Sequence, residues 1–77
     1  MLTFEMQEKG DVAEIHFDEE GRELLIRLLL QIKPPWNHEH LMSEAWAGNE
    51  LDNEPFNKNN TVLNMVNVYL HHPAESE

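Results

Sequence analysis

Hydrophobic positions between residues 19 and 33 recur with the period of an α-helix, and no other segment of the chain is periodic over such a length. At about 100° per residue, five apolar side chains gather on one face of this helix. They are Leu24, Leu25, Leu28, Leu29 and Ile32. Asp18 is a favourable N-cap, Pro34 ends the helix, and Gly21 is expected to weaken the first turn by up to about 1 kcal/mol. The pattern predicts an amphipathic helix on which the remaining segments pack.

Ile26 and Leu30 lie outside this face, so the apolar arc is wider than a helix on a single sheet requires. Two interpretations remain open. A loop folds over both residues, or they contact a partner or a second copy of the chain, as large exposed apolar patches do.

Polar and apolar residues alternate in two segments at the start of the chain, residues 2–6 and 12–17. Side chains two positions apart share one face of a strand. The residues expected to face the core are Leu2, Phe4, Met6, Ala13, Ile15 and Phe17. Glu14 and His16 are expected to face outward, and a turn around Gly10 joins the segments. The pattern predicts a β-hairpin over residues 1–17.

The chain after the helix contains less regular segments. We expect a short strand at 38–43, an irregular acidic loop at 44–60, a strand at 61–71 and a polar tail at 72–77. Trp36 is expected to cover one end of the core. The residues that could anchor the acidic loop are Trp46, Leu51 and Phe56.

These elements predict a single α+β domain over residues 1–77, with the order ββαββ. A small antiparallel sheet of about four strands would carry one helix packed across it. The last strand has apolar side chains on both faces, which is typical of a central strand or of one covered by an interface.

Composition narrows the classes of function. The chain has no cysteine, which excludes disulfides and thiolate metal sites and favours the cytoplasm. Neither a signal peptide nor a membrane span is expected. Fifteen acidic and five basic residues give a net charge of −10. Such a charge repels nucleic acids and anionic membranes, and it favours a basic protein partner.

Chemical motifs are few. His38 and His40 would point to the same face of a strand and could bind a metal if His16, His71 or His72 supplied a third nitrogen. Two ligands are unspecific, however, and no cofactor is expected. The carboxylates of the acidic loop do not match a calcium-binding loop, and no phosphate-binding loop is present. We expect a protein that is not an enzyme.

The acidic loop favours protein binding. Tryptophan is the residue type most enriched at the energetic centres of interfaces, and carboxylates around it would suit a basic target. The expected partner-binding residues are Trp46, Glu44, Glu50, Asp52 and Glu54. Alternatively, Trp46 and Phe56 pin the loop to the core. A second hypothesis is a homodimeric structural domain that associates through Ile26, Leu30, Met65 and Tyr69.

Three stretches of sequence between residues 17 and 70, which carry four features, resemble a family of small bacterial immunity proteins from polymorphic-toxin systems. A leucine-rich helix follows an acidic segment with a glycine, then come H-x-H-L-M and W-x-G-x-E-L, and a strand closes the chain. The matching residues of the two short motifs are His38, His40, Leu41, Met42, Trp46, Gly48, Glu50 and Leu51. Ala47 stands where the family pattern has a second glycine. The resemblance implies a non-enzymatic protein that binds and neutralises a cognate toxin, and it assigns no binding residues.

Overall fold

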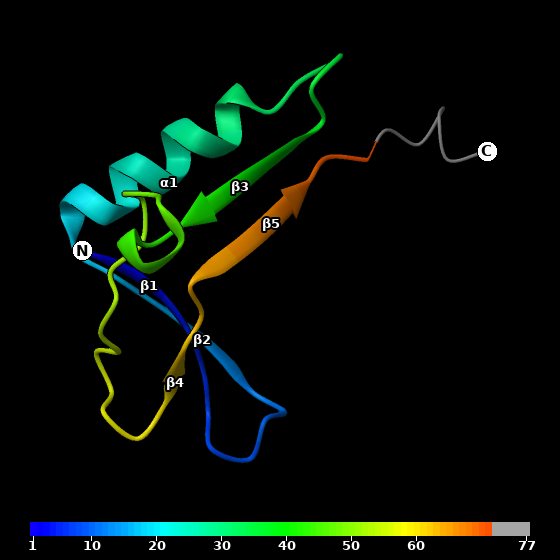
Figure 1. Ribbon diagram of the computed structural model, residues 1–77. Coiled ribbons are helices and arrows are strands. Elements are labelled where there is room, and N and C mark those ends of the chain that lie inside the picture. The colour runs from blue at the N-terminus through cyan, green and yellow to red at the C-terminus, as the bar shows by residue number, and fades with distance from the viewer. Residues whose placement is uncertain (72–77) are drawn as a thin grey trace.

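The computed structural model describes residues 1–71, which form one α-helix, one short 3-10 helix and five strands (Figure 1). The elements are β1 (Leu2–Met6), β2 (Ala13–Phe17), α1 (Glu19–Gln31), β3 (His38–Met42), η1 (Glu44–Trp46), β4 (Thr61–Val62) and β5 (Met65–Tyr69). The predicted α+β class is confirmed. The strands form two antiparallel sheets, β2-β1-β4 and β3-β5, where a single sheet of about four strands was expected. The polar tail at 72–77 lies outside the described residues.

The last strand, which was expected to be continuous over 61–71, is divided into β4 and β5, and these belong to different sheets. β4 pairs with β1, and β5 pairs with β3. Between them, the Leu63 amide donates to the Phe4 carbonyl (2.8 Å), and the Asn64 carbonyl accepts from the Ser43 amide (2.9 Å). The chain therefore passes from one sheet to the other within two residues.

α1 begins as the sequence predicts and ends slightly earlier, at Gln31. The Asp18 carboxylate caps the helix by accepting a hydrogen bond from the Gly21 amide (2.8 Å). Gly21 is more than a weak point, because a Cβ there would lie 1.8 Å from the Met1 carbonyl oxygen. This close approach of the chain start requires glycine.

The hydrophobic core lies between α1, the inner face of β3 and β5, and the first part of β1. Three leucines are almost fully buried in it: Leu2, Leu41 and Leu51. The partly buried residues that pack against them are Phe4, Leu24, Leu25, Leu28, Val66 and Val68. Leu51 thus anchors the acidic loop, as predicted. Leu29, expected on the core face, is 46% exposed.

The expected burial of β2 is wrong. Ala13, Ile15 and Phe17 share the face of Leu2 and Phe4, but they are exposed, with Ile15 at 49%. Figure 1 shows the reason: α1 runs beside β3 and diverges from β1 and β2, so the apolar side of β2 has no helix over it. Alternation therefore predicted correctly which residues share a face, but not which face is covered.

Two further expectations concern exposed apolar residues. Trp36 does not cover the core: it follows a cis Pro34-Pro35 bond and is 74% exposed. Leu30 is 77% exposed and Ile26 is 46% exposed, so no loop within residues 1–71 covers them.

Within residues 1–71, no helix combines the length and hydrophobicity that a membrane crossing requires.

Candidate functional site

A buried polar network lies on the second face of the β1–β2 hairpin, opposite the hydrophobic core. Glu5 pairs with Glu14 across the two strands, and Thr3 pairs with His16, so all four side chains share this face. The Glu5 side chain is 0% exposed, and Asn60, from the end of the acidic loop, is 8% exposed. A charged residue in such a position needs several hydrogen-bond partners.

Glu5 obtains these partners mainly from the acidic loop. Its Oε1 accepts from Asn60 Nδ2 (2.9 Å) and from the Asn57 amide (3.3 Å). Its Oε2 accepts from the Phe56 amide (2.7 Å) and from the Thr3 hydroxyl. Burial alone would raise the pKa of Glu5, but these hydrogen bonds outweigh it and lower the pKa to about 2. The ionised carboxylate therefore holds residues 56–60 against the hairpin.

Glu14 extends the network toward solvent. Its carboxylate accepts from Gln7 Nε2 (2.6 Å) and Asn60 Nδ2 (3.0 Å), and it lies 2.7 Å from His16 Nε2. The hydrogen bond from Gln7, followed by those involving His16 and Asn60, lowers the pKa of Glu14. The His16 ring stacks on Phe56, with ring centroids 5.2 Å apart. Phe56 thus rests on the network from outside and stays 70% exposed.

Three side chains of the network could hold a cation. Ligand atoms of Glu5, Glu14 and His16 lie within 4.8 Å of one another. Asn60 Nδ2 already donates to both carboxylates, and every oxygen of Glu5 accepts a hydrogen bond. A cation would have to displace Asn60 from between the carboxylates, so the observed bonding favours a structural role for this network.

The histidines singled out for metal binding, His38 and His40, lie in the other sheet. They share the outer face of β3, as alternation predicts, with ring centroids 5.0 Å apart. His38 stacks on Tyr69, and His40 Nδ1 pairs with Asn67 Oδ1. Among residues 1–71, the trio of potential metal ligands includes neither of them. His72 lies beyond the described residues.

The first part of the acidic loop is held close to β3 by its backbone. The amides of Trp46 and Gly48 both donate to the Ser43 carbonyl (2.9 Å each). Ala47, where the immunity-protein pattern has a glycine, adopts φ 67°, a left-handed conformation that favours glycine. A Cβ on Gly48 would lie 2.5 Å from both Cβ and the carbonyl oxygen of Met42. The turn after η1 thus packs directly on the strand.

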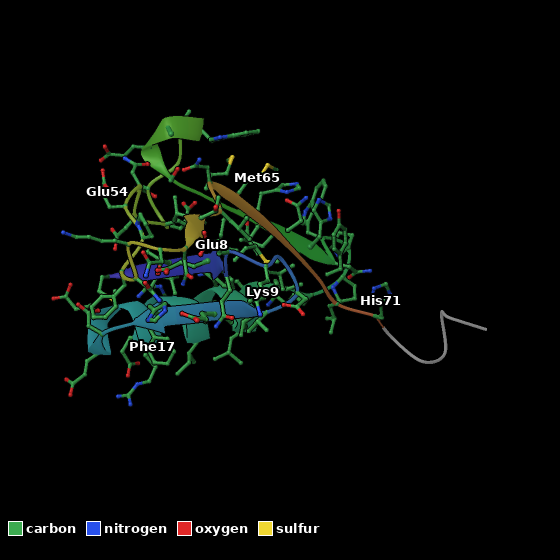
Figure 2. The ribbon with its side chains drawn as sticks, turned by 90° about the horizontal axis from the view of Figure 1, so that it is seen from below. Glu8, Lys9, Phe17, Glu54, Met65 and His71 are labelled. Atoms are coloured by element: carbon green, nitrogen blue, oxygen red, sulfur yellow. The ribbon has the colours of Figure 1, made fainter. Side chains whose placement is uncertain are left out.

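The expected partner-binding residues occupy two kinds of position on this loop. Trp46 is 56% exposed, and Glu44 and Glu54 are exposed. Glu50 and Asp52 also serve the fold, because they accept hydrogen bonds from the amides of Met42 (2.9 Å) and Leu2 (3.1 Å). Figure 2 shows Glu54 on the outside of the loop, on the opposite side of the molecule from Phe17.

The four residues proposed for self-association do not form one surface. Val66 and Val68 pack on the core beneath α1, so their neighbours Met65 and Tyr69 point to the outer face of β5. Ile26 and Leu30 lie on the outer side of α1. The helix and the β3–β5 sheet therefore separate the two pairs.

Sequence reasoning missed the buried network, although a signal for it exists. Alternation places Thr3 and Glu5 on one face of the first strand and Glu14 and His16 on the matching face of the second. A hairpin brings two such polar sets together, and an asparagine-rich segment at 57–60 offers donors.

A scan against protein-family models and searches of curated proteins and of solved structures found no match to this chain. Neither the fold nor the network therefore carries a function over from another protein.

Proposed function

We propose that this protein is a non-enzymatic protein-binding domain that docks onto a basic partner through the outer side of its acidic loop. The observation that carries the proposal is the exposure of Trp46 (56%) and Phe56 (70%) on a loop that is anchored by other residues. Exposed aromatic side chains on a rigid support are typical of binding surfaces.

The anchoring of the loop supports this proposal. Leu51 is buried in the core, Ser43 is buried beside Asn64, and Glu5 holds the amides of residues 56 and 57. A loop that is ordered before binding loses less conformational entropy when a partner docks. Neither Trp46 nor Phe56 is needed as a core anchor, so both can contribute their aromatic surface to a contact.

Charge supports a basic partner. The chain carries a net charge of −10, and Glu44 and Glu54 extend from the same loop as the two aromatic side chains. Carboxylates at the rim of an interface mainly accelerate association with an oppositely charged protein and disfavour partners of like charge. The resemblance to immunity proteins extends the proposal to a basic toxin domain that the docked protein neutralises.

The experiment is a capture of partners from lysate of the source cells, followed by affinity measurements on the purified partner. Trp46→Ala is expected to weaken binding by about 2 kcal/mol or more, because tryptophan at the centre of an interface dominates its energy. Unfolding of each variant is measured in parallel, so that lost binding is not confused with lost structure.

A charge-matched pair of double variants tests the electrostatic part. Glu44→Gln with Glu54→Gln removes two charges from the acidic loop, and Glu8→Gln with Asp11→Asn removes two from the exposed hairpin turn. The loop pair is expected to slow association and reduce its dependence on salt more than the hairpin pair. Equal effects of both pairs would reject a docking site on this loop.

Neutralisation is tested separately. The captured partner is expected to arrest growth when expressed alone and to be tolerated when this protein is co-expressed. Trp46→Ala should then fail to protect while remaining folded. A captured partner that is harmless alone would reject the immunity role and leave protein binding in place.

A further inference from the structure

β2 is the edge strand of the larger sheet, and no second strand pairs with its outer edge within residues 1–71. The sheet order is β2-β1-β4, so β2 pairs with β1 alone. Proteins usually protect an exposed edge with a lysine, a proline or a bulge. β2 contains neither lysine nor proline, and its register with β1 is continuous over its whole length. Such an edge is a template for pairing with another strand.

The hydrogen bonds to β1 determine which backbone groups of β2 face outward. At one end of the hairpin, the Gln7 amide donates to the Val12 carbonyl (2.9 Å). At the other end, the Asp18 amide donates to the Met1 carbonyl (3.2 Å). In an antiparallel pair, residues that bond to the partner strand alternate with residues that point away from it. Even-numbered residues of β2 therefore bond to β1, and odd-numbered residues direct their amides and carbonyls to the open edge.

The pairing on the other side of β1 agrees with this alternation. Phe4, which lies opposite Ile15, directs its carbonyl away from β2 and accepts a hydrogen bond from the Leu63 amide (2.8 Å). The backbone of Ile15 in turn points away from β1. The residues of β2 that face outward are Ala13, Ile15 and Phe17. No backbone hydrogen bond within residues 1–71 uses their amides or carbonyls.

The sequence of β2 is complementary to itself in the antiparallel sense. A two-fold axis at Ile15 places Ala13 opposite Phe17 of the second copy, so the outward-facing groups of both strands bond to one another. The same axis places Glu14 opposite His16 of the second copy, so an acidic side chain faces a basic one. An axis at Glu14 would instead bring two carboxylates together. The register centred on Ile15 therefore satisfies both the backbone and the charges.

The apolar face of β2 adds buried surface to this pairing. Ile15 is 49% exposed and Phe17 is 48% exposed, on the face that α1 leaves uncovered. Joining the two edges at Ile15 places the two Ile15 side chains next to each other on one face of the combined sheet. Each copy thus covers part of the other's exposed apolar surface.

We propose that a second copy of this chain pairs with the outer edge of β2, antiparallel and centred on Ile15, so that two three-stranded sheets become one. The contact involves one short strand from each copy, and each chain carries a net charge of −10, so the association is weak. Figure 2 shows Phe17 on the opposite side of the molecule from Glu54. The dimer therefore leaves the outer side of the acidic loop around Glu54 open to a partner.

The test is sedimentation equilibrium of the whole chain from about 10 μM to about 1 mM. Salt at about 0.3 M screens the repulsion between two acidic chains. Wild type is expected to shift from monomer toward a mass twice 9.1 kDa across this range. Ile15→Lys and Ile15→Glu should each weaken the dimer by about tenfold or more, because each places like charges opposite one another on the axis. Urea denaturation of each variant shows whether the monomer remains folded.

Mixing the two variants tests the position of the axis. The Ile15→Lys chain and the Ile15→Glu chain should associate with each other more strongly than either does with itself, because only the mixed pair places opposite charges on the axis. The matched controls are Leu30→Lys and Leu30→Glu, which make the same changes at a side chain of α1 that is 77% exposed. They should dimerise like wild type.

Nuclear magnetic resonance tests the register directly. A mixture of isotope-labelled and unlabelled wild-type chains reports only contacts between different copies. Glu14 and His16 occupy positions where opposite residues of an antiparallel pair approach most closely. An intermolecular nuclear Overhauser effect is therefore expected between the α-proton of Glu14 in one copy and the α-proton of His16 in the other.

Three results would overturn the inference. A wild-type chain that stays monomeric up to about 1 mM would exclude the dimer. A mixture of the Ile15 variants that gains no affinity, or Leu30 variants that weaken association as much as the Ile15 variants, would place the contact on another surface. Dimerisation without the contact between Glu14 and His16 would reject the register. Partner binding is measured separately with Trp46→Ala, so failure of one proposal does not mimic failure of the other.

Discussion

The inner and outer sides of the acidic loop differ in the opposite sense to the one that residue chemistry alone predicts, which is aromatic side chains inside and charged ones outside. On the inner side, the carboxylate of Glu5 is completely buried and accepts four hydrogen bonds. On the outer side, Trp46 and Phe56 are more than half exposed. The charged residue holds the structure together, and the aromatic residues face solvent.

The contrast follows from the size of the domain. A short chain buries a small hydrophobic core, here centred on Leu2, Leu41 and Leu51. Such a core cannot cover both faces of the β1–β2 hairpin and also hold a long loop. Hydrogen bonds from the loop to Glu5 hold the loop instead, so its aromatic side chains are not needed for this and stay at the surface.

The substitution expected to disturb this arrangement most is Glu5→Gln. An amide can accept hydrogen bonds at only one of its two ends, so its NH₂ group would face donors from Thr3 and Phe56 or from Asn57 and Asn60. We expect a loss of about 3 kcal/mol in the free energy of unfolding. Urea denaturation at neutral pH measures it.

The control is Glu54→Gln, which removes the same charge from the outer side of the loop. It should change the free energy of unfolding by no more than about 0.5 kcal/mol. If both variants have equal stability, the buried network does not hold the loop.

Acid should act on the same group. The pKa of Glu5 is about 2 in the folded protein, against an ordinary value of 4.5. Its contribution to the free energy of unfolding is fully present above the ordinary pKa and is lost as the pH falls through the folded pKa, a change on the order of 3 kcal/mol. The lowered pKa of Glu14 acts in the same direction.

The measurement is the free energy of unfolding between about pH 2 and pH 7. Wild type should lose stability steeply over the acidic part of this range, and Glu5→Gln should lose clearly less. Parallel curves for the two proteins would show that Glu5 is not the titrating group responsible.

A smaller effect is expected where the loop turns over β3. In Gly48→Ala, the added methyl group would meet Met42 at 2.5 Å, including its backbone oxygen. We expect a loss of about 2 kcal/mol, because the backbone must shift to make room. Thermal unfolding followed by circular dichroism reports the change.

The neighbouring position supplies the opposite substitution. Ala47→Gly relieves a positive φ of 67° but adds freedom to the unfolded chain, so its stability should stay within about 1 kcal/mol of wild type. Two variants one residue apart thus separate close packing from backbone conformation. A Gly48→Ala protein as stable as wild type would show that η1 is not packed on β3.

Local signals predicted the local parts of the fold. The leucine spacing and Asp18 gave α1 and its first residue, and alternation gave the β1–β2 hairpin. Which strand faces are covered by other elements, and which strands share a sheet, could not be predicted in the same way. Ile15 is exposed because α1 diverges from β2, and the strand after Thr61 breaks at Leu63 because it joins two different sheets.

The candidate site was predicted only in part for the same reason. The acidic loop and its aromatic residues are visible in the sequence. The burial of Glu5 depends on donors more than fifty residues later, at Phe56, Asn57 and Asn60. No periodicity reports contacts over such a separation, so the residue that orders the loop was missed.

A small expected effect on stability is also the most direct test of the central claim, which is that the loop supports Trp46 and does not depend on it. The measurement is the free energy of unfolding of Trp46→Ala by urea at neutral pH. A change below about 1 kcal/mol is predicted, because the side chain is more than half exposed. A loss of about 3 kcal/mol or more, as for a buried tryptophan, would make Trp46 a core anchor and contradict the proposed binding surface.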